Sequence, residues 1–152
     1  MGDTLAFDAT AVALENGAVL LTGKSGSGKS DLALRLIDAG ARLIADDRVE
    51  LIVTDGRLHC RAPRDMPPEL KGRIEARGVG IIPVAAVDGP VPVLWLVELV
   101  PANEIERLPQ AVSHRLLGQE VPVLRLAPFE ASAVTKLRLA AACGPGLIMG
   151  RE

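Results

Sequence analysis

The chain has 152 residues, the length of one ordinary domain, and we expect residues 1–152 to fold as a single domain without disulfide or metal support. Apolar residues make up 49% of the sequence and aromatic residues only 2%, which favours a core of Leu, Val, Ile and Ala in an α/β layer structure. The formal net charge of −2 leaves no basic excess with which to bind a nucleic-acid backbone, so we expect no nucleic-acid partner.

The two cysteines and the hydropathy of the chain indicate its cellular compartment. Cys60 and Cys143 belong to no C-x-x-C motif or Cys/His cluster, so the sequence predicts no zinc site and no disulfide framework. No stretch approaches the ~18 consecutive apolar residues of a membrane span, and the first residues do not resemble a signal peptide. We therefore expect a soluble, cytoplasmic protein in a reduced setting, with no membrane partner.

The first half of the chain predicts a hairpin, a helix and a buried strand. Residues 10–14 and 18–22 are short apolar runs, and the Asn16-Gly17 pair between them favours a tight turn between two strands. After a glycine-rich segment, apolar residues at helical spacing predict a helix over residues 29–39. Residues 43–45 predict a buried strand that ends at two acidic residues.

The second half predicts mainly strands. Short apolar runs predict them over residues 49–53, 58–61, 81–87, 91–100 and 121–126. The run over 91–100 is apolar enough to be central in a sheet. A proline-rich loop is expected over 62–71, and a polar connection with a short helix over 101–119. Strong helix formers predict a last helix over 131–142, before Gly144-Pro145-Gly146.

The glycine-rich segment matches the phosphate-binding P-loop pattern G-x-x-x-x-G-K-[ST]. It lies between a predicted strand and a predicted helix, with the sequence Gly23-Lys24-Ser25-Gly26-Ser27-Gly28-Lys29-Ser30. Glycines let backbone N–H groups approach phosphate oxygens, and the helix N-terminus adds partial positive charge. We expect Lys29 to contact the β and γ phosphates and Ser30 to bind Mg²⁺, with Lys24, Ser25 and Ser27 contributing backbone groups. The alternative is a glycine turn that only leads into a helix.

Two adjacent acids, Asp46 and Asp47, follow the predicted strand about sixteen residues after Ser30. The intervening helix should return the chain and leave both carboxylates near the phosphate end of the sheet. Carboxylates beside a triphosphate are unfavourable unless one binds a metal or accepts a proton from the attacking hydroxyl. The alternative is that Asp46-Asp47-Arg48 is a solvated turn.

A second glycine-containing segment has the sequence Glu75-Ala76-Arg77-Gly78-Val79-Gly80. It combines an acid, a base and two flexible positions, a composition able to close over an anionic substrate. The alternative is that Gly78 and Gly80 are turn glycines that lead into a strand.

These three segments resemble the catalytic domain of the HPr kinase/phosphorylase family, bifunctional enzymes that phosphorylate a serine of the phosphocarrier protein HPr. The similarity covers residues 20–51 and 72–82 and continues more weakly from Glu106-Arg107 to the C-terminal helix. It implies an α/β fold with a mixed sheet, a single P-loop domain related to the nucleotide-binding fold of phosphoenolpyruvate carboxykinase. It also implies ATP and Mg²⁺ as cofactors, an HPr-like phosphocarrier as partner, and a homo-oligomer of hexameric form.

Carried over residue by residue, the resemblance implies that Asp46 is the catalytic base and acid and that Asp47 and Ser30 bind Mg²⁺. Glu75 would be a further acid at the metal site. Arg77 and Arg107 would steady the phosphate and communicate between subunits.

Among the departures from the family pattern, Asp8 stands where the family usually has a histidine that interacts with the catalytic aspartate. A carboxylate near Asp46 would repel its charge, so we expect Asp8 to weaken catalysis more than nucleotide binding. The sequence thus favours an ATP-dependent protein-serine kinase, with a possible phosphorylase activity. A nucleotide-binding regulatory module with little turnover and a kinase for another acceptor are the alternatives.

Overall fold

One mixed sheet organises residues 3–150, the part of the chain that this computed structural model describes. Its strand order is β1-β5-β6-β9-β3-β2-β4, with β11 beside β9 and β10 beside β11. The strands are β1 Thr4–Phe7, β2 Thr10–Leu14, β3 Gly17–Thr22, β4 Arg42–Ala45, β5 Val49–Thr54, β6 Arg57–Arg61, β9 Val91–Leu99, β10 Val112–Leu116 and β11 Gln119–Leu126.

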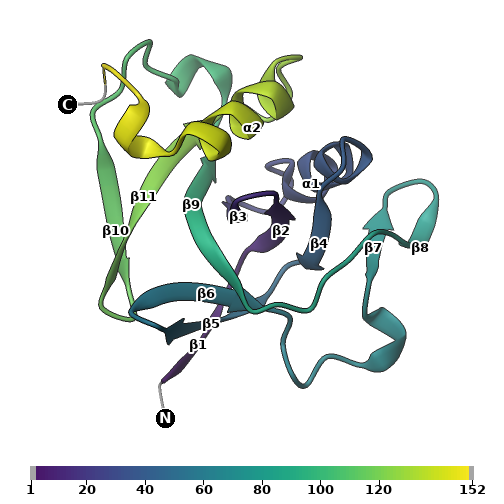
Figure 1. Cartoon of the computed structure of the whole chain (residues 1–152). Coiled ribbons are helices and arrows are strands. Elements are labelled where there is room, and N and C mark those ends of the chain that lie inside the picture. The colour runs from purple at the N-terminus through teal and green to yellow at the C-terminus, as the bar shows by residue number, and fades with distance from the viewer. Residues whose placement is uncertain (1–2, 151–152) are drawn as a thin grey trace.

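Two helices and a separate hairpin complete the structure (Figure 1). The helices are α1 Lys29–Asp38 and α2 Ala133–Cys143, and the hairpin consists of β7 Arg73–Ala76 and β8 Gly80–Pro83. Single 3-10 turns lie at Pro68–Leu70, Ala102–Glu104 and Pro145–Leu147. In the described part of the chain, neither of these helices has the length and hydropathy to cross a membrane.

Strand β9 is the centre of the sheet, as its apolar sequence predicts. Its second half pairs in parallel with β3 on one side and β11 on the other, whereas its first residues pair with the antiparallel strand β6. Because the two ends of β9 have different neighbours, the sheet curls, and Figure 1 shows β1, β5 and β6 crossing below the strands that carry α1 and α2.

The curl creates two hydrophobic cores on the two faces of the central strands. Along β3, Val19 and Leu21 face the helices, whereas Ala18 and Leu20 face the β1-β5-β6 part of the sheet. This is the alternation of side chains expected of a strand buried on both faces. The helix-side core also holds Trp95, whose indole N–H donates to the Ala140 carbonyl of α2 at 3.1 Å.

Most predicted elements are confirmed, but the prediction for residues 81–87 is wrong in extent. Strand β8 ends at Pro83, which has no N–H to donate to a partner strand. The chain then passes beside β4, where Leu43 N–H donates to Ala85 O and Val87 N–H donates to Leu43 O. The polar connection expected over 101–119 holds the expected short helical turn, Ala102–Glu104, but also an unpredicted strand, β10.

The first testable prediction concerns the two free cysteines. Cys60 is buried in the second core, and this burial raises the pKa of its thiol to about 12, whereas Cys143 is exposed. Because the thiolate is the nucleophile, alkylation of the folded protein at mildly alkaline pH should modify Cys143 and spare Cys60 until urea unfolds the chain. Mass spectrometry of both peptides measures this, and equal labelling of the two cysteines in the native state would contradict the fold.

Candidate functional site

The segment Gly23–Ser30, called the glycine loop below, connects the end of β3 to the first turn of α1. Its tight bend depends on residues without a Cβ. Gly28 has a φ of 104°, and a Cβ there would lie 2.9 Å from the Phe129 ring. A Cβ at Gly23 would lie 2.5 Å from the Ser27 hydroxyl oxygen. The positive φ at both ends of the motif favours glycine, and a side chain at Gly28 would also have to displace the Phe129 ring.

The glycine loop has hydrogen-bond donors that are available to a bound anion. No side chain caps the N-terminus of α1, so the N–H groups of its first turn lack a side-chain partner. The Lys29 ammonium group folds back and donates to the Gly23 carbonyl at 2.9 Å. Among the described residues, the Ser27 hydroxyl is the buried side-chain polar group without a hydrogen-bond partner. A phosphate chain fits these residues, because its oxygens would satisfy the free donors.

The Asp46 carboxylate lies against this loop. Asp46 follows the end of β4 and is half-buried, and its Oδ1 accepts hydrogen bonds from Thr10 Oγ1 at 2.8 Å and from Ser30 Oγ at 3.1 Å. The structure thus joins the acid to the last residue of the motif, although 16 positions separate them in the sequence. Both hydroxyls reach the same oxygen, so neither of these bonds engages Oδ2.

Sequence reasoning missed Thr10, which orders this site from the neighbouring strand. Thr10 is fully buried at the start of β2, and its hydroxyl donates to Asp46 and accepts from the Asp47 N–H at 3.2 Å. The adjacent Ala9 N–H donates to the Asp47 carbonyl at 3.1 Å. A buried threonine at a strand end was a possible signal, but its importance depends on the pairing of β2 with β4, which the sequence does not reveal.

Asp47 adds a second carboxylate on the exposed side of the turn. Its φ of 67° is a left-handed conformation that Asp tolerates better than most residues. Its carboxylate and the Ser30 hydroxyl are oxygen ligands of the kind that Mg²⁺ prefers. In residues 3–150 no group of three or more His, Cys, Asp or Glu side chains could hold a metal alone. These residues fit an ion that also takes ligands from a bound phosphate, since protein Mg²⁺ sites commonly use one or two carboxylates.

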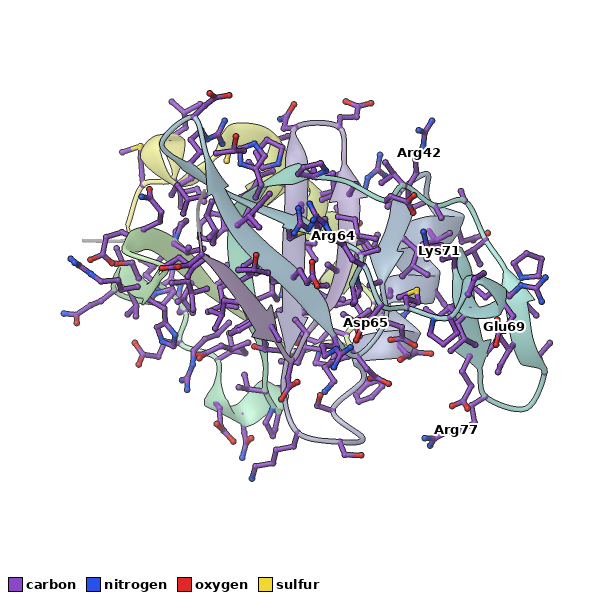
Figure 2. The ribbon with its side chains drawn as sticks, turned by 90° about the horizontal axis from the view of Figure 1, so that it is seen from below. Arg42, Arg64, Asp65, Glu69, Lys71 and Arg77 are labelled. Atoms are coloured by element: carbon purple, nitrogen blue, oxygen red, sulfur yellow. The ribbon has the colours of Figure 1, made fainter. Side chains whose placement is uncertain are left out.

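The structure does not bring the other predicted site residues to this centre. Glu75 is exposed on β7, and Arg107 is exposed in the loop after the turn at Ala102–Glu104. Figure 2 shows Arg77 at the tip of the β7–β8 hairpin, with its side chain directed away from the body of the molecule. Within the described residues, no hydrogen bond or ion pair connects these three side chains with Asp46 or the glycine loop.

Asp8 is exposed between β1 and β2. The neighbouring backbone N–H, from Ala9, bonds to the Asp47 carbonyl, so Asp8 adjoins the turn that carries both acids.

Comparison with known proteins identifies the family of the chain. Residues 3–137 match the family described as the HPr serine kinase C-terminal domain. The chain belongs to this family. In solved structures, the HPr(Ser) kinase/phosphatase from Coxiella burnetii has the same fold, with a TM-score of 0.72, 27% sequence identity, and coverage of 91% of this chain and 87% of that one. The mixed, curled sheet is therefore shared with an HPr kinase structure.

Curated relatives in the HPr serine kinase family are larger proteins. The HPr kinase/phosphorylase of Bordetella petrii is 37% identical over 116 residues, which cover 68% of this chain and 36% of that protein. The HPr kinase/phosphorylase of Clostridium kluyveri is 46% identical over 71 residues, which cover 47% of this chain and 22% of that protein. The matched part of the chain thus spans about a third or less of the length of these relatives.

The second testable prediction concerns the hydroxyl of Thr10. Thr10→Val keeps the shape of the side chain but removes its bonds to the Asp46 carboxylate and the Asp47 N–H. We expect a loss of about 2 kcal/mol in the free energy of unfolding, because hydrogen bonds to charged groups contribute about 1.5–3 kcal/mol. Urea denaturation measures this loss.

Thr22→Val is the matched control, because Thr22 Oγ1 donates to the neutral Val97 carbonyl at 2.9 Å. Its expected loss is about 1 kcal/mol. Equal losses for the two variants would mean that the carboxylate adds nothing to the Thr10 bond.

Proposed function

We propose that this chain is an ATP-dependent protein-serine kinase that acts on an HPr-like phosphocarrier protein, with the glycine loop as its P-loop. The observation that carries the proposal is the hydrogen bond from Ser30 Oγ to Asp46 Oδ1 at 3.1 Å, which sets a proton acceptor beside a phosphate-binding motif. Membership of the HPr serine kinase family supports the reaction class, and relatives named HPr kinase/phosphorylase support the acceptor.

In the proposed reaction, the glycine loop and the N-terminus of α1 hold the phosphates through backbone N–H groups. Lys29 exchanges the Gly23 carbonyl for phosphate oxygens and offsets their charge. Ser30 and Asp47 would hold Mg²⁺, which neutralises charge on the phosphate oxygens when bound. Asp46 accepts the hydroxyl proton of the acceptor serine. At the same time, the serine oxygen forms a bond to the γ-phosphorus, and the bond between this phosphorus and the leaving ADP oxygen breaks.

The remaining predicted residues act from the periphery in this proposal. Glu75 would support the metal site, and Arg77 and Arg107 would contact the phosphate or a neighbouring subunit once the acceptor is bound. Their exposure supports this assignment, because an exposed arginine is available to a partner. We further propose a single domain over residues 1–152, related to the nucleotide-binding fold of phosphoenolpyruvate carboxykinase, that assembles as a hexamer in the cytoplasm.

A nucleotide-binding regulatory module is the second candidate. The observation that favours it is Asp8, a carboxylate beside the acidic turn where the resemblance places a histidine. Like charge near Asp46 opposes its role as a base without affecting the glycine loop. Such a module would bind ATP and transfer its phosphate poorly.

The third testable prediction separates the two lysines of the glycine loop by calorimetric titration with MgATP. Lys29→Ala should weaken binding roughly 10- to 100-fold, because a charge-assisted contact with phosphate contributes about 1.5–3 kcal/mol. Gly28→Val should weaken it further, since a side chain at this position collides with Phe129. Lys24→Ala is the control and should bind normally, because only its backbone is assigned to phosphate. Undiminished binding by Lys29→Ala would refute the P-loop assignment.

The fourth testable prediction concerns the base and its neighbour. In single-turnover transfer from radiolabelled ATP to purified HPr, Asp46→Asn should lower the rate by about 10²–10⁴-fold, the usual contribution of a general base. Its ATP affinity should stay within a few-fold, because Asp46 acts on the acceptor. Asp8→His should raise the transfer rate, since a histidine removes the like charge and can orient Asp46.

Two other outcomes would change the proposal. ATP binding without transfer in the unmodified chain and in Asp8→His would favour the regulatory module. Transfer that survives Asp46→Asn would remove Asp46 as the base.

A further inference from the structure

Phe129 is an exposed aromatic ring in a chain that has few aromatic residues. It lies in the loop between β11 and α2, and 70% of its surface is exposed, whereas Trp95 is fully buried. Aromatic residues make up only 2% of the sequence. A phenyl ring with this exposure gains little of the free energy that burial of apolar surface provides. Its position therefore calls for an explanation other than packing of the core.

The backbone beneath the ring is held firmly. The Arg35 guanidinium of α1 donates to the Pro128 carbonyl, and Arg35 is itself paired with Asp31 at 3.0 Å. The Glu130 carbonyl accepts from the Ala133 N–H at 3.1 Å, and the Glu130 carboxylate pairs with Lys136 at 3.1 Å. Ala127 and Pro128, the residues before the ring, are buried. An exposed side chain on a fixed backbone is suited to contact a ligand without a large cost in chain entropy.

The ring lies directly on the glycine loop. A Cβ built on Gly28 would be 2.9 Å from Phe129 Cζ and 3.2 Å from Cε1. Gly28 immediately precedes Lys29 and the first turn of α1, where the free N–H groups lie. If the phosphates of a ligand occupy this loop, the part of the ligand that follows them would lie next to the phenyl ring.

The acids and the ring lie on opposite sides of the glycine loop. In the sheet, β3 has β9 and then β11 on one side, and β2 and then β4 on the other (Figure 1). Asp46 follows β4, and Phe129 follows β11. A nucleotide bound with its γ-phosphate toward Asp46 thus has its other end, the base, directed toward Phe129.

We propose that Phe129 is the stacking platform for the purine base of the bound nucleotide. The inference rests on the proposed function, because it assigns the second end of the same ligand. Stacking uses the π face that every base has, and the ring offers no hydrogen bond with which to distinguish bases. The subsite therefore favours a ligand that has a large flat base over a ligand that has no base. It should accept guanine nearly as well as adenine.

The fifth testable prediction compares two ligands on the full chain by calorimetry with Mg²⁺ present. ATP carries a base, and inorganic tripolyphosphate has the same phosphate chain without one. Phe129→Ala should weaken ATP binding roughly tenfold, within the range measured for base-stacking aromatic residues, and leave tripolyphosphate binding unchanged. Phe129→Trp should restore ATP affinity. Leu139→Ala is the matched control, because Leu139 is 65% exposed on α2 and should affect neither ligand.

Fluorescence gives a second measurement. Trp95 is the single tryptophan of the chain and is fully buried, so the added emission of Phe129→Trp should come from the ring position. ATP should quench this emission by stacking, and tripolyphosphate should not.

Each other result has a distinct meaning. If Phe129→Ala weakens both ligands equally, the ring only supports the glycine loop through Gly28 and the base subsite is refuted. If it weakens neither ligand but slows transfer to HPr, the ring contacts the acceptor protein instead. If the unmodified chain binds tripolyphosphate and ATP equally, the base makes no contact and the subsite fails while the P-loop assignment stands. If the unmodified chain binds neither ligand, both the proposed nucleotide site and the base subsite are refuted.

Discussion

Hydrogen bonds to the carboxylate of Asp46 connect three segments of the chain at one oxygen atom. Thr10 reaches it from the start of β2, Ser30 from the first turn of α1, and Asp46 itself follows β4. Strand β2 is antiparallel to both β3 and β4. The carboxyl ends of β3 and β4 and the amino end of β2 therefore share one edge of the sheet. This arrangement brings the glycine loop, the acid and its buried hydroxyl partner together.

The same edge explains how an acidic chain could hold an anion. The formal net charge is −2, so long-range attraction does not favour a triphosphate. Local groups have to supply the attraction instead. The partial positive charge of the uncapped N-terminus of α1 and the full charge of the Lys29 ammonium group both lie at this edge. The two carboxylates limit this attraction unless they share a cation with the phosphate. In the proposed reaction, proton acceptance by Asp46 and metal binding by Asp47 are therefore linked, because the two residues are adjacent in the chain.

Much of this centre could be predicted from the sequence because its signals are local. The Asn16-Gly17 turn, the glycine loop and the helix that follows it are encoded within about 25 residues, where turn chemistry and apolar spacing are informative. The position of Asp46 beside the glycine loop was predicted because one helix returns the chain, although its hydrogen bond with Ser30 was not. Thr10 could not be found in this way, because its partner is fixed by the pairing of strands β2 and β4.

The missed strands have weak or misleading local signals. Strand β10 is mostly exposed and polar, and its turn into β11 places Leu117 at a φ of 50°, where a glycine or asparagine would be expected. Strand β7 was missed because the segment around Gly78 and Gly80 suggested a substrate loop; the alternative, turn glycines that lead into a strand, is what the structure shows at Gly78. In both hairpins, pairing with a neighbouring strand stabilises residues whose own preferences are slight.

The order of strands in the mixed sheet separates two parts of the candidate site, the proposed proton acceptor and the proposed contact of the base. On one side of β3, strand β2 carries Thr10 and the next strand, β4, leads to Asp46; both residues serve proton transfer in the proposed reaction. On the other side, β9 and then β11 lead to Phe129, the proposed contact of the base. The glycine loop lies between the two groups: the Phe129 ring lies beside Gly28, and Ser30 Oγ donates to Asp46. Substitutions on the β4 side should therefore change the rate of transfer, and substitutions on the β11 side should change affinity. Effects of distant, unconnected residues add, so a double variant of Asp46 and Phe129 would show coupling only if the glycine loop transmits a shift between them.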